Sequence, residues 1–164
     1  MIDLREYSDL ARESGAYTDI ELDILDEALS AWIKSPGKPN ILVELRDGKV
    51  LAGFAVMRRE EVTEYTFNTQ TICVGSSYLG TGAMASLLAK LEGEIRQKAD
   101  SAILRVETST QKTAAFDVDA LVDAGYSLIG HIPDFYAKGN DYFMYAKHLY
   151  IGKKEGGNLE GKGE

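Results

Sequence analysis

Two glycines separated by one residue, Gly80 and Gly82, stand directly before a strongly periodic apolar run in the segment YLGTGAMASLLAKLE (78–92). The apolar spacing predicts a helix, which places the glycines at its N-terminus. The first turn of a helix has N–H groups without partners and the positive end of the dipole, and glycine lets the backbone approach an anion closely. The pattern therefore indicates a main-chain cradle for phosphate, or a loop that needs glycine only for its positive φ.

The same letters fit the dinucleotide fingerprint G-x-G-x-x-G/A, with Glu107 at the end of the next predicted strand. In that fold the first glycine follows its strand almost at once, whereas GSSYL separates Gly80 from Val74 here. The fold also needs more strand–helix units than this chain supplies. A dinucleotide site is therefore disfavoured.

Other motifs for nucleophilic or metal chemistry are incomplete. The segment GSSYL (75–79) lacks the closing glycine of a hydrolase nucleophile elbow. His131 and His148 have no spacing that suggests a metal site, so no metal is expected. Cys73, the single cysteine, lies in an apolar strand pattern and is expected to pack rather than react.

The composition is typical of one globular domain. The 164 residues carry a formal net charge of −8, which disfavours nucleic acid and anionic membranes as partners. No window approaches the roughly 18 uninterrupted apolar residues of a membrane span. The acidic start MIDLREYSDLARES and the single cysteine favour a cytoplasmic protein without an internal disulfide.

Two helices are expected ahead of the strands. Residues 4–11 form a short apolar stripe. Thr18 followed by Glu21 makes a capping box for a second helix. The segment Ser-Pro-Gly at 35–37 ends that helix.

Strand patterns follow this helical region. The runs at 41–46 and 49–58 flank Asp47-Gly48, a hairpin signal in which both turn residues would take positive φ. A third β-rich run spans Val62 to Val74. Together the three runs predict an antiparallel meander.

The second half of the chain alternates helices and strands. The apolar stripe at 84–95 predicts a helix and the run at 102–108 a strand, which implies a parallel crossover from the strand before the glycines. A weaker helix is expected at 114–124, ended by Gly125.

Two last strands close the predicted domain, which spans residues 1–151. They lie at 126–131 and 141–149 and are separated by a loop at 132–140. The tail at 152–164 is rich in glycine and charge and is expected to be disordered.

The order of elements and the glycine loop together resemble the GNAT superfamily of N-acetyltransferases. The resemblance covers residues 4–149 and includes the segments VETS (106–109), DAGY (123–126) and IPDFYAKGND (132–141). It implies an α/β fold with a mixed, mostly antiparallel, splayed sheet flanked by helices.

The resemblance also implies acetyl-coenzyme A as co-substrate. The family motif Arg/Gln-x-x-Gly-x-Gly/Ala, whose N–H groups hold the coenzyme pyrophosphate, is similar to Leu79, Gly80, Thr81, Gly82, Ala83 and Met84. Leu79 replaces the usual Arg or Gln, and Met84 replaces the usual small residue. Weaker binding is expected rather than none, because the cradle is backbone.

The strand before the loop would, by the same resemblance, splay from its neighbour. Main-chain groups of Ile72, Cys73 and Val74 would then pair with the pantetheine arm. The amide of Val74 would polarise the thioester carbonyl. Lys112 would meet a coenzyme phosphate, or is only a solvated loop lysine.

The family's usual acid, a tyrosine in the penultimate helix that protonates the leaving thiolate, is replaced here by Leu121. A thiol pKa near about 8.5 means that an unprotonated thiolate costs roughly 2 kcal/mol at neutral pH, so it can leave unaided. Tyr136 is a substitute candidate, or an aromatic residue that packs the last hairpin.

The amine acceptor needs a base, because only a neutral amine attacks. Glu107, at the end of the parallel strand, is the first choice. Asn68 and Gln70 would align a water, and Glu64 and Asp134 are weaker alternatives.

The expected function is transfer of an acetyl or short acyl group from acetyl-CoA to a primary amine, by direct attack in a ternary complex. The acceptor would be a small molecule or a peptide, and a homodimer is compatible with the fold. The alternatives are a catalytically silent module that binds acyl-CoA or a partner, and a structural domain that binds no coenzyme.

Overall fold

The computed structural model describes residues 3–150, except for the side chain of residue 114. The strands are β1 (Asn40–Asp47), β2 (Val50–Arg59), β3 (Thr66–Val74), β4 (Ser101–Ser109), β5 (Ser127–Ala137) and β6 (Asn140–Tyr150). The helices are α1 (Arg5–Glu13), α2 (Asp19–Lys34), α3 (Ala83–Arg96) and α4 (Val118–Asp123), with 3₁₀ turns η1 (Ser76–Tyr78) and η2 (Gln111–Ala115).

The strands form one mixed sheet in the order β1-β2-β3-β4-β6-β5. Only β3 and β4 are parallel, as the crossover through α3 requires, and all other neighbours are antiparallel. The predicted meander and the predicted α/β class are confirmed.

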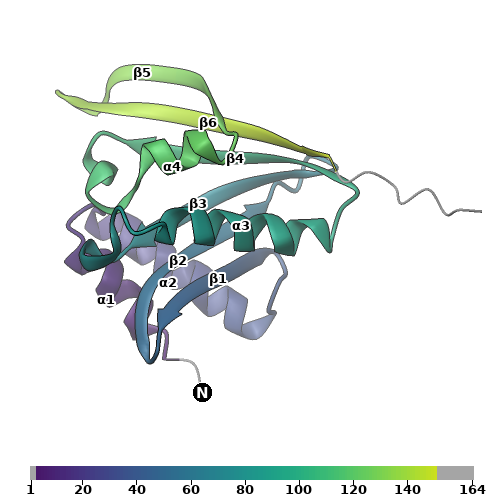
Figure 1. Cartoon of the computed structure of the whole chain (residues 1–164), viewed down its shortest axis with the longest axis horizontal. Coiled ribbons are helices and arrows are strands. Elements are labelled where there is room, and N and C mark those ends of the chain that lie inside the picture. The colour runs from purple at the N-terminus through teal and green to yellow at the C-terminus, as the bar shows by residue number, and fades with distance from the viewer. Residues whose placement is uncertain (1–2, 151–164) are drawn as a thin grey trace, which may run out of the picture.

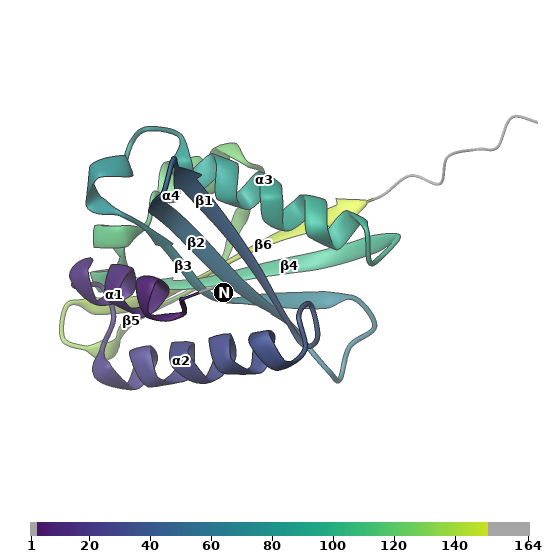
Figure 2. The ribbon, with the colours of Figure 1, turned by 90° about the horizontal axis from the view of Figure 1, so that it is seen from below.

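Helices cover both faces of the sheet. Figure 2 shows α1 and α2 on one face and α3 on the other, and Figure 1 places α4 beside α3. Each layer has its own core. The predicted stripe of α3 is fully buried in one core, and Leu25 and Leu29 of α2 are buried in the other. Among the described residues, no helix has the length and apolar character needed to cross a bilayer.

Local signals place the start of α2 correctly. The Thr18 hydroxyl accepts the Glu21 N–H at 3.3 Å, and the Glu21 carboxylate accepts the Thr18 N–H at 2.9 Å. These two bonds satisfy donors that a helix start otherwise leaves free. The predicted capping box is confirmed.

The hairpin turn lies one residue later than predicted. Asp47 is still paired with Val50, so Gly48 and Lys49 form the turn, and of the two only Gly48 has positive φ, at 57°. The expectation of positive φ twice was wrong, because a glycine at the first turn position is enough to match the strand twist.

Strand β3 is shorter than the predicted run of 62–74. It begins at Thr66, and the Glu60 N–H bonds to the Thr66 carbonyl at 2.9 Å to close a turn over the residues between. Val62 lies in this turn and is 95% exposed. Its β-branched side chain favoured a strand in the sequence, but the residue belongs to none.

The predicted helix at 114–124 was also too long. It begins at Val118, where the Asp117 carboxylate accepts the Ala120 N–H at 3.1 Å, and η2 precedes it. Gly125, with φ of 91°, ends it as expected.

The predicted loop at 132–140 was wrong. Strand β5 continues to Ala137 and β6 starts at Asn140, which leaves a two-residue turn. Pro133 and Asp134 interrupt the pairing, which is irregular between Ile132 and Ala137. An edge strand tolerates this because its outer N–H groups need no partner strand. The predicted tail at 152–164 lies outside the described residues.

Candidate active site

Strands β3 and β4 diverge after four paired residues. Residues Thr66–Thr69 pair with Ile103–Val106, and beyond them β3 stays with β2 while β4 stays with β6. A gap therefore opens between the two parallel strands and leads toward the glycine loop. The predicted splay is confirmed.

A β-bulge at Gln70 lies at the point of divergence. Thr69 pairs with Met57 and Thr71 with Val56, so Gln70 is an extra residue on β3. Bulges bend a strand and increase its twist. The side-chain alternation also shifts, because Phe67 before the bulge and Ile72 after it both belong to the core under α3.

Main-chain groups of Ile72 and Val74 face the gap. The Gly75 N–H bonds to the Ala52 carbonyl at 2.9 Å, and hydrogen-bonded pairs alternate along an antiparallel ladder. The main-chain groups of Cys73 therefore point to β2 and those of its two neighbours point away. Of the three predicted pantetheine partners, the geometry supports Ile72 and Val74.

The Cys73 side chain is buried in the core under α1, with its Sγ 3.9 Å from the Leu10 carbonyl. Burial raises the pKa of the thiol to about 12. The thiol is thus uncharged at neutral pH and packs, in line with the prediction.

Tyr17 and Lys112 fill the gap. The Tyr17 hydroxyl donates to the Ile72 carbonyl at 2.7 Å, and the Lys112 ammonium lies 5.5 Å from the centroid of the Tyr17 ring. Lys112 also pairs with Glu21 at 2.6 Å, and its side chain is only 17% exposed. The remaining cavity has a volume of about 10 Å³, at the limit for one water.

These contacts give Lys112 a place that differs from both sequence interpretations. Lys112 is not a solvated loop lysine, because its side chain is mostly buried. Its ammonium is already paired with Glu21 and is therefore not free to bind a coenzyme phosphate. Tyr17 was missed altogether. Burial raises its pKa well above the usual range, so it is a neutral hydrogen-bond donor. Its position directly before the N-cap Thr18 was the only signal in the sequence.

The glycine loop forms an open cradle. Gly80 and Gly82 have φ of 73° and 86°, and a Cβ on either would meet no atom of the described chain within 4 Å. Gly82 is the N-cap of α3 without a side-chain cap, and the first N–H of the helix to find an acceptor is that of Ser86, at 3.0 Å from the Gly82 carbonyl. Within residues 3–150, the amides of 82–85 donate to no acceptor. They are available to an anion.

The two departures from the family motif lie inside the fold. The Met84 side chain is 2% exposed in the core under α3, so it does not enter the cradle. Leu79 packs partly against the same core. Thr81 turns its hydroxyl back to the Tyr78 carbonyl at 2.6 Å, and Ala83 is buried as the first helical residue. The cradle is therefore backbone alone.

A hollow of about 320 Å³ adjoins the cradle and carries negative charge. Leu79 and Gly80 line one side, and Asp117 and Asp119 of the α4 start line another. Of the residues that the structure describes, no lysine or arginine lines this hollow. These carboxylates oppose a phosphate that the free amides would attract.

Glu107 lies on β4 beside the gap. Leu104 and Val106 point into the core under α3, so Arg105 and Glu107 occupy the face that α2 covers. The Arg105 guanidinium donates to the Glu107 carboxylate at 2.6 Å, and the Glu107 side chain is 32% exposed. A partly solvated carboxylate at this position can accept a proton from a nearby group.

Several buried polar atoms on β3 and β4 have no hydrogen-bond partner among the described residues. Asn68 Oδ1, Gln70 Oε1 and Arg105 Nε are three of them. Asn68 is directly opposite Arg105 in the β3–β4 register. Because buried polar atoms are rarely left without partners, this cluster is suited to hold a polar ligand or water.

Tyr136 lies on the same side as Glu107. Burial, and then the charges of Glu107 and Glu21, raise the pKa of its phenol. Its ring also packs against Phe135 and Tyr142, with centroid distances of 4.9 and 6.3 Å. Tyr136 is thus close enough to feel the Glu107 charge and also packs the hairpin.

The two weaker candidates lie farther away. Glu64 precedes β3 at the end opposite to Val74, so the whole strand separates it from the cradle. Asp134 is at the β5–β6 tip, where its carboxylate accepts the Gly139 N–H at 2.6 Å. At the position of the missing tyrosine, Leu121 is fully buried and apolar.

The fold is that of the GNAT N-acetyltransferases. A GNAT-family acetyltransferase structure from Desulfovibrio desulfuricans superimposes with a TM-score of 0.76 at 22% identity, covering 92% of this chain and 93% of that one. An aminoglycoside 6'-N-acetyltransferase complexed with coenzyme A gives 0.67 at 18% identity, with 88% and 89% covered.

A ribosomal-protein-alanine N-acetyltransferase from Brucella melitensis gives a TM-score of 0.69 at 16% identity, with 90% of this chain and 94% of that one covered. No protein-family model matches the sequence, and no curated protein matches it. At these identities the likeness concerns the fold.

Proposed function

We propose that this chain is an N-acyltransferase that moves an acetyl or short acyl group from a coenzyme A thioester to a primary amine. The observation that carries the proposal is the gap between β3 and β4 that leads to a cradle of free amides at the start of α3. The same fold holds coenzyme A in the aminoglycoside acetyltransferase. When bound, the coenzyme supplies an activated thioester.

Main-chain groups do most of the binding in this proposal. The amides of 82–85 hold the pyrophosphate, with Gly80 and Gly82 giving access. The gap-facing groups of Ile72 and Val74 pair with the pantetheine arm, and the amide of either donates to the thioester carbonyl. Tyr17 and Lys112 move aside when the coenzyme enters. Without coenzyme, the Tyr17 hydroxyl satisfies the Ile72 carbonyl.

The chemistry belongs to side chains on the α2 face. Glu107 takes the proton that a primary amine must lose before it attacks, directly or through a water held by Asn68 and Gln70. Tyr136 supplies a proton to the leaving thiolate. This proton is only a modest help, because a thiolate of ordinary pKa can also leave without it. The acceptor amine lies between α2 and the β5–β6 hairpin.

A second function, a catalytically silent module on the same scaffold, is favoured by two observations. Leu121 removes the family's usual acid, and the carboxylates of Asp117 and Asp119 lower the attraction for phosphate. Turnover of acetyl-CoA with a panel of primary amines separates the two functions, since a silent module binds the thioester without consuming it.

The melting temperature tests the coenzyme site directly. Acetyl-CoA and desulfo-CoA are expected to raise it and NAD is not, because binding to the folded state at about 100 times Kd adds roughly 2.7 kcal/mol of stability. Absence of any shift with both coenzyme A compounds would contradict the proposed site.

Removing negative charge beside the cradle should tighten coenzyme binding. Asp119→Lys is expected to lower the Kd for coenzyme A by about three- to tenfold at low salt, and by less as salt screens the charge. Asp123→Lys is the matched control, since it makes the same charge change on α4 but does not line the hollow. Calorimetric titration at two salt concentrations measures the Kd of both variants. If Asp123→Lys changes the Kd as much as Asp119→Lys does, the effect does not come from the charge that lines the hollow.

A further inference from the structure

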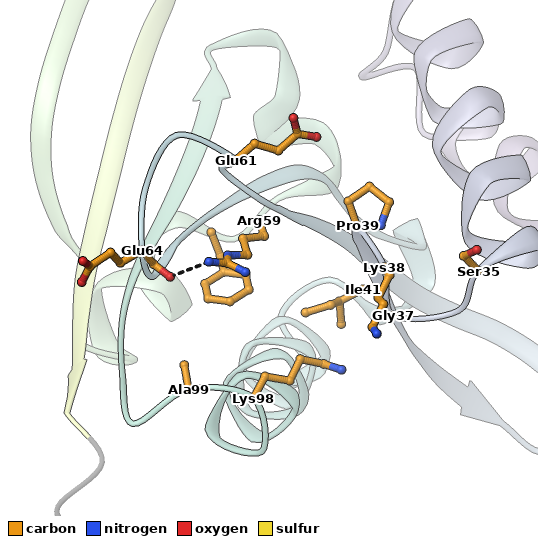
Figure 3. Close-up of a pocket in the computed structure, with 11 residues that line it drawn as sticks. Ser35, Gly37, Lys38, Pro39, Ile41, Arg59, Glu61, Glu64, Lys98 and Ala99 are labelled. Carbon is orange, nitrogen blue, oxygen red and sulfur yellow. Dashed lines mark hydrogen bonds between the residues drawn. The ribbon is translucent and has the colours of Figure 1, made fainter.

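A large cavity lies at the end of the sheet opposite to the glycine loop. Its volume is about 770 Å³, and it is enclosed by the α2–β1 connection, the β2–β3 turn and the end of α3 (Figure 3). None of its lining residues belongs to the proposed acyl-transfer site. Strand β3 connects the two regions, with Phe67 at one end and Val74 at the other.

The floor of this cavity is apolar. Ile41 and Phe67, which are 4% and 5% exposed, line it together with Ala99. Both larger side chains belong to the core under α3, so the floor is rigid. A ligand that covers it would gain from burial of its own apolar surface.

The walls carry cations without carboxylate partners. Lys38, Arg59 and Lys98 line the cavity, and none pairs with an acid of the described residues. In a chain with a net charge of −8, these three cations line one cavity together with two carboxylates, those of Glu61 and Glu64.

Of these cations, Arg59 is held by a hydrogen bond, and Lys98 lies beside Gly37. The Arg59 guanidinium donates to the Glu64 carbonyl at 2.9 Å, a bond that leaves its charge unneutralised. The Lys98 ammonium lies against the main chain of Gly37, where a Cβ would be 3.3 Å from it. In Figure 3 the Arg59 guanidinium lies at the centre of the view and the Lys98 ammonium points toward Gly37.

The carboxylates at the cavity do not cancel this charge. The side chains of Glu61 and Glu64 point away from the centre in Figure 3, and Glu61 pairs with Arg58 at 2.9 Å. The carbonyl of Ile95 at the end of α3 is already bonded to the amides of Lys98 and Ala99, at 2.9 and 3.0 Å. The cavity therefore presents positive charge above an apolar floor.

We propose that this cavity binds a small organic anion, with one carboxylate or phosphate group held by Arg59 and Lys98 and an apolar body against Phe67 and Ile41. Arginine and lysine both bind such groups, and the planar guanidinium can do so with two parallel bonds. The site is separate from the proposed transfer site and does not depend on it.

Amide chemical shifts of the full chain locate the ligand. Hexanoate and hexyl phosphate are the probes, and hexylamine is the cationic control of the same length. Both anions are expected to shift the amides of Gly37 and Ala99 in a saturable way, and the amine is not. The comparison of the two anions shows which head group the site prefers. Saturable shifts of Gly37 and Ala99 by the amine as well, or by none of the three, would overturn the proposal.

Two variants test the charges. Lys98→Glu and Arg59→Gln are each expected to raise the Kd of the anion by about tenfold, as reversal or loss of one charge at contact distance predicts. Lys49→Glu, at the exposed β1–β2 turn, is the matched control and should leave the Kd unchanged. All three side chains are at the surface, so the fold is expected to survive. An unchanged Kd in both cavity variants would refute the site.

Discussion

Gly82→Val is expected to raise the Kd for coenzyme A by about hundredfold or more, since it removes several charge-assisted contacts at once. Gly82 has φ of 86° and caps α3, and the space where a Cβ would lie is open. Branched methyl groups in that space would stand where phosphate approaches the amides. A left-handed conformation costs a β-branched residue about 1–2 kcal/mol, which a folded domain can tolerate. Calorimetric titration and thermal unfolding measure the two effects separately.

The control for this variant is Gly139→Val. Gly139 has φ of 79° and equally open surroundings, but it lies at the β5–β6 turn. It should lose the same stability and keep the affinity for coenzyme A. The cradle assignment fails if Gly82→Val binds normally, or if the two variants lose affinity equally.

Features set by short-range physics could be predicted from the sequence. The capping box of Thr18 and Glu21 and the two glycines before α3 act within one turn of chain, so their residue types decide their geometry. The apolar stripe of α3 could be predicted from its spacing, because one face of a surface helix must be buried. These signals were enough to predict the antiparallel meander, the parallel crossover and a glycine loop before α3.

The contents of the gap depend on distant segments and could not be predicted in this way. The Gln70 bulge arises from how β3 pairs with β2, and no turn residue marks it. Tyr17 meets Ile72, 55 residues later, and Lys112 meets Glu21 across the same gap. Residues 132–137, the second part of β5, were mistaken for a loop. Pro133 cannot donate to a ladder, and only the edge position of the strand makes it acceptable there.

Glu107→Gln is expected to lower kcat for amine acetylation by about 10²- to 10⁴-fold, the usual contribution of a positioned general base. This expectation rests on the proposed transfer function. Glutamine keeps the shape of the side chain and can still accept the Arg105 bond, so the site should remain folded. The Kd for coenzyme A should not change, because Glu107 lies where β3 and β4 begin to diverge. The cradle lies at the opposite end of the gap, at the start of α3. Steady-state kinetics and calorimetric titration distinguish loss of chemistry from loss of binding.

Asp134→Asn is the matched control for the base. It removes one carboxylate from the hairpin near the proposed acceptor site, and asparagine tolerates the φ of 53° that Asp134 adopts. Its amide oxygen can still accept the Gly139 N–H, so kcat should stay within about twofold. If both variants lose activity equally, the summed negative charge of the acceptor site attracts the amine, and Glu107 is not the base. If Glu107→Gln keeps full activity, solvent takes the proton, and the unpaired atoms of Asn68 and Gln70 then position the water that does so.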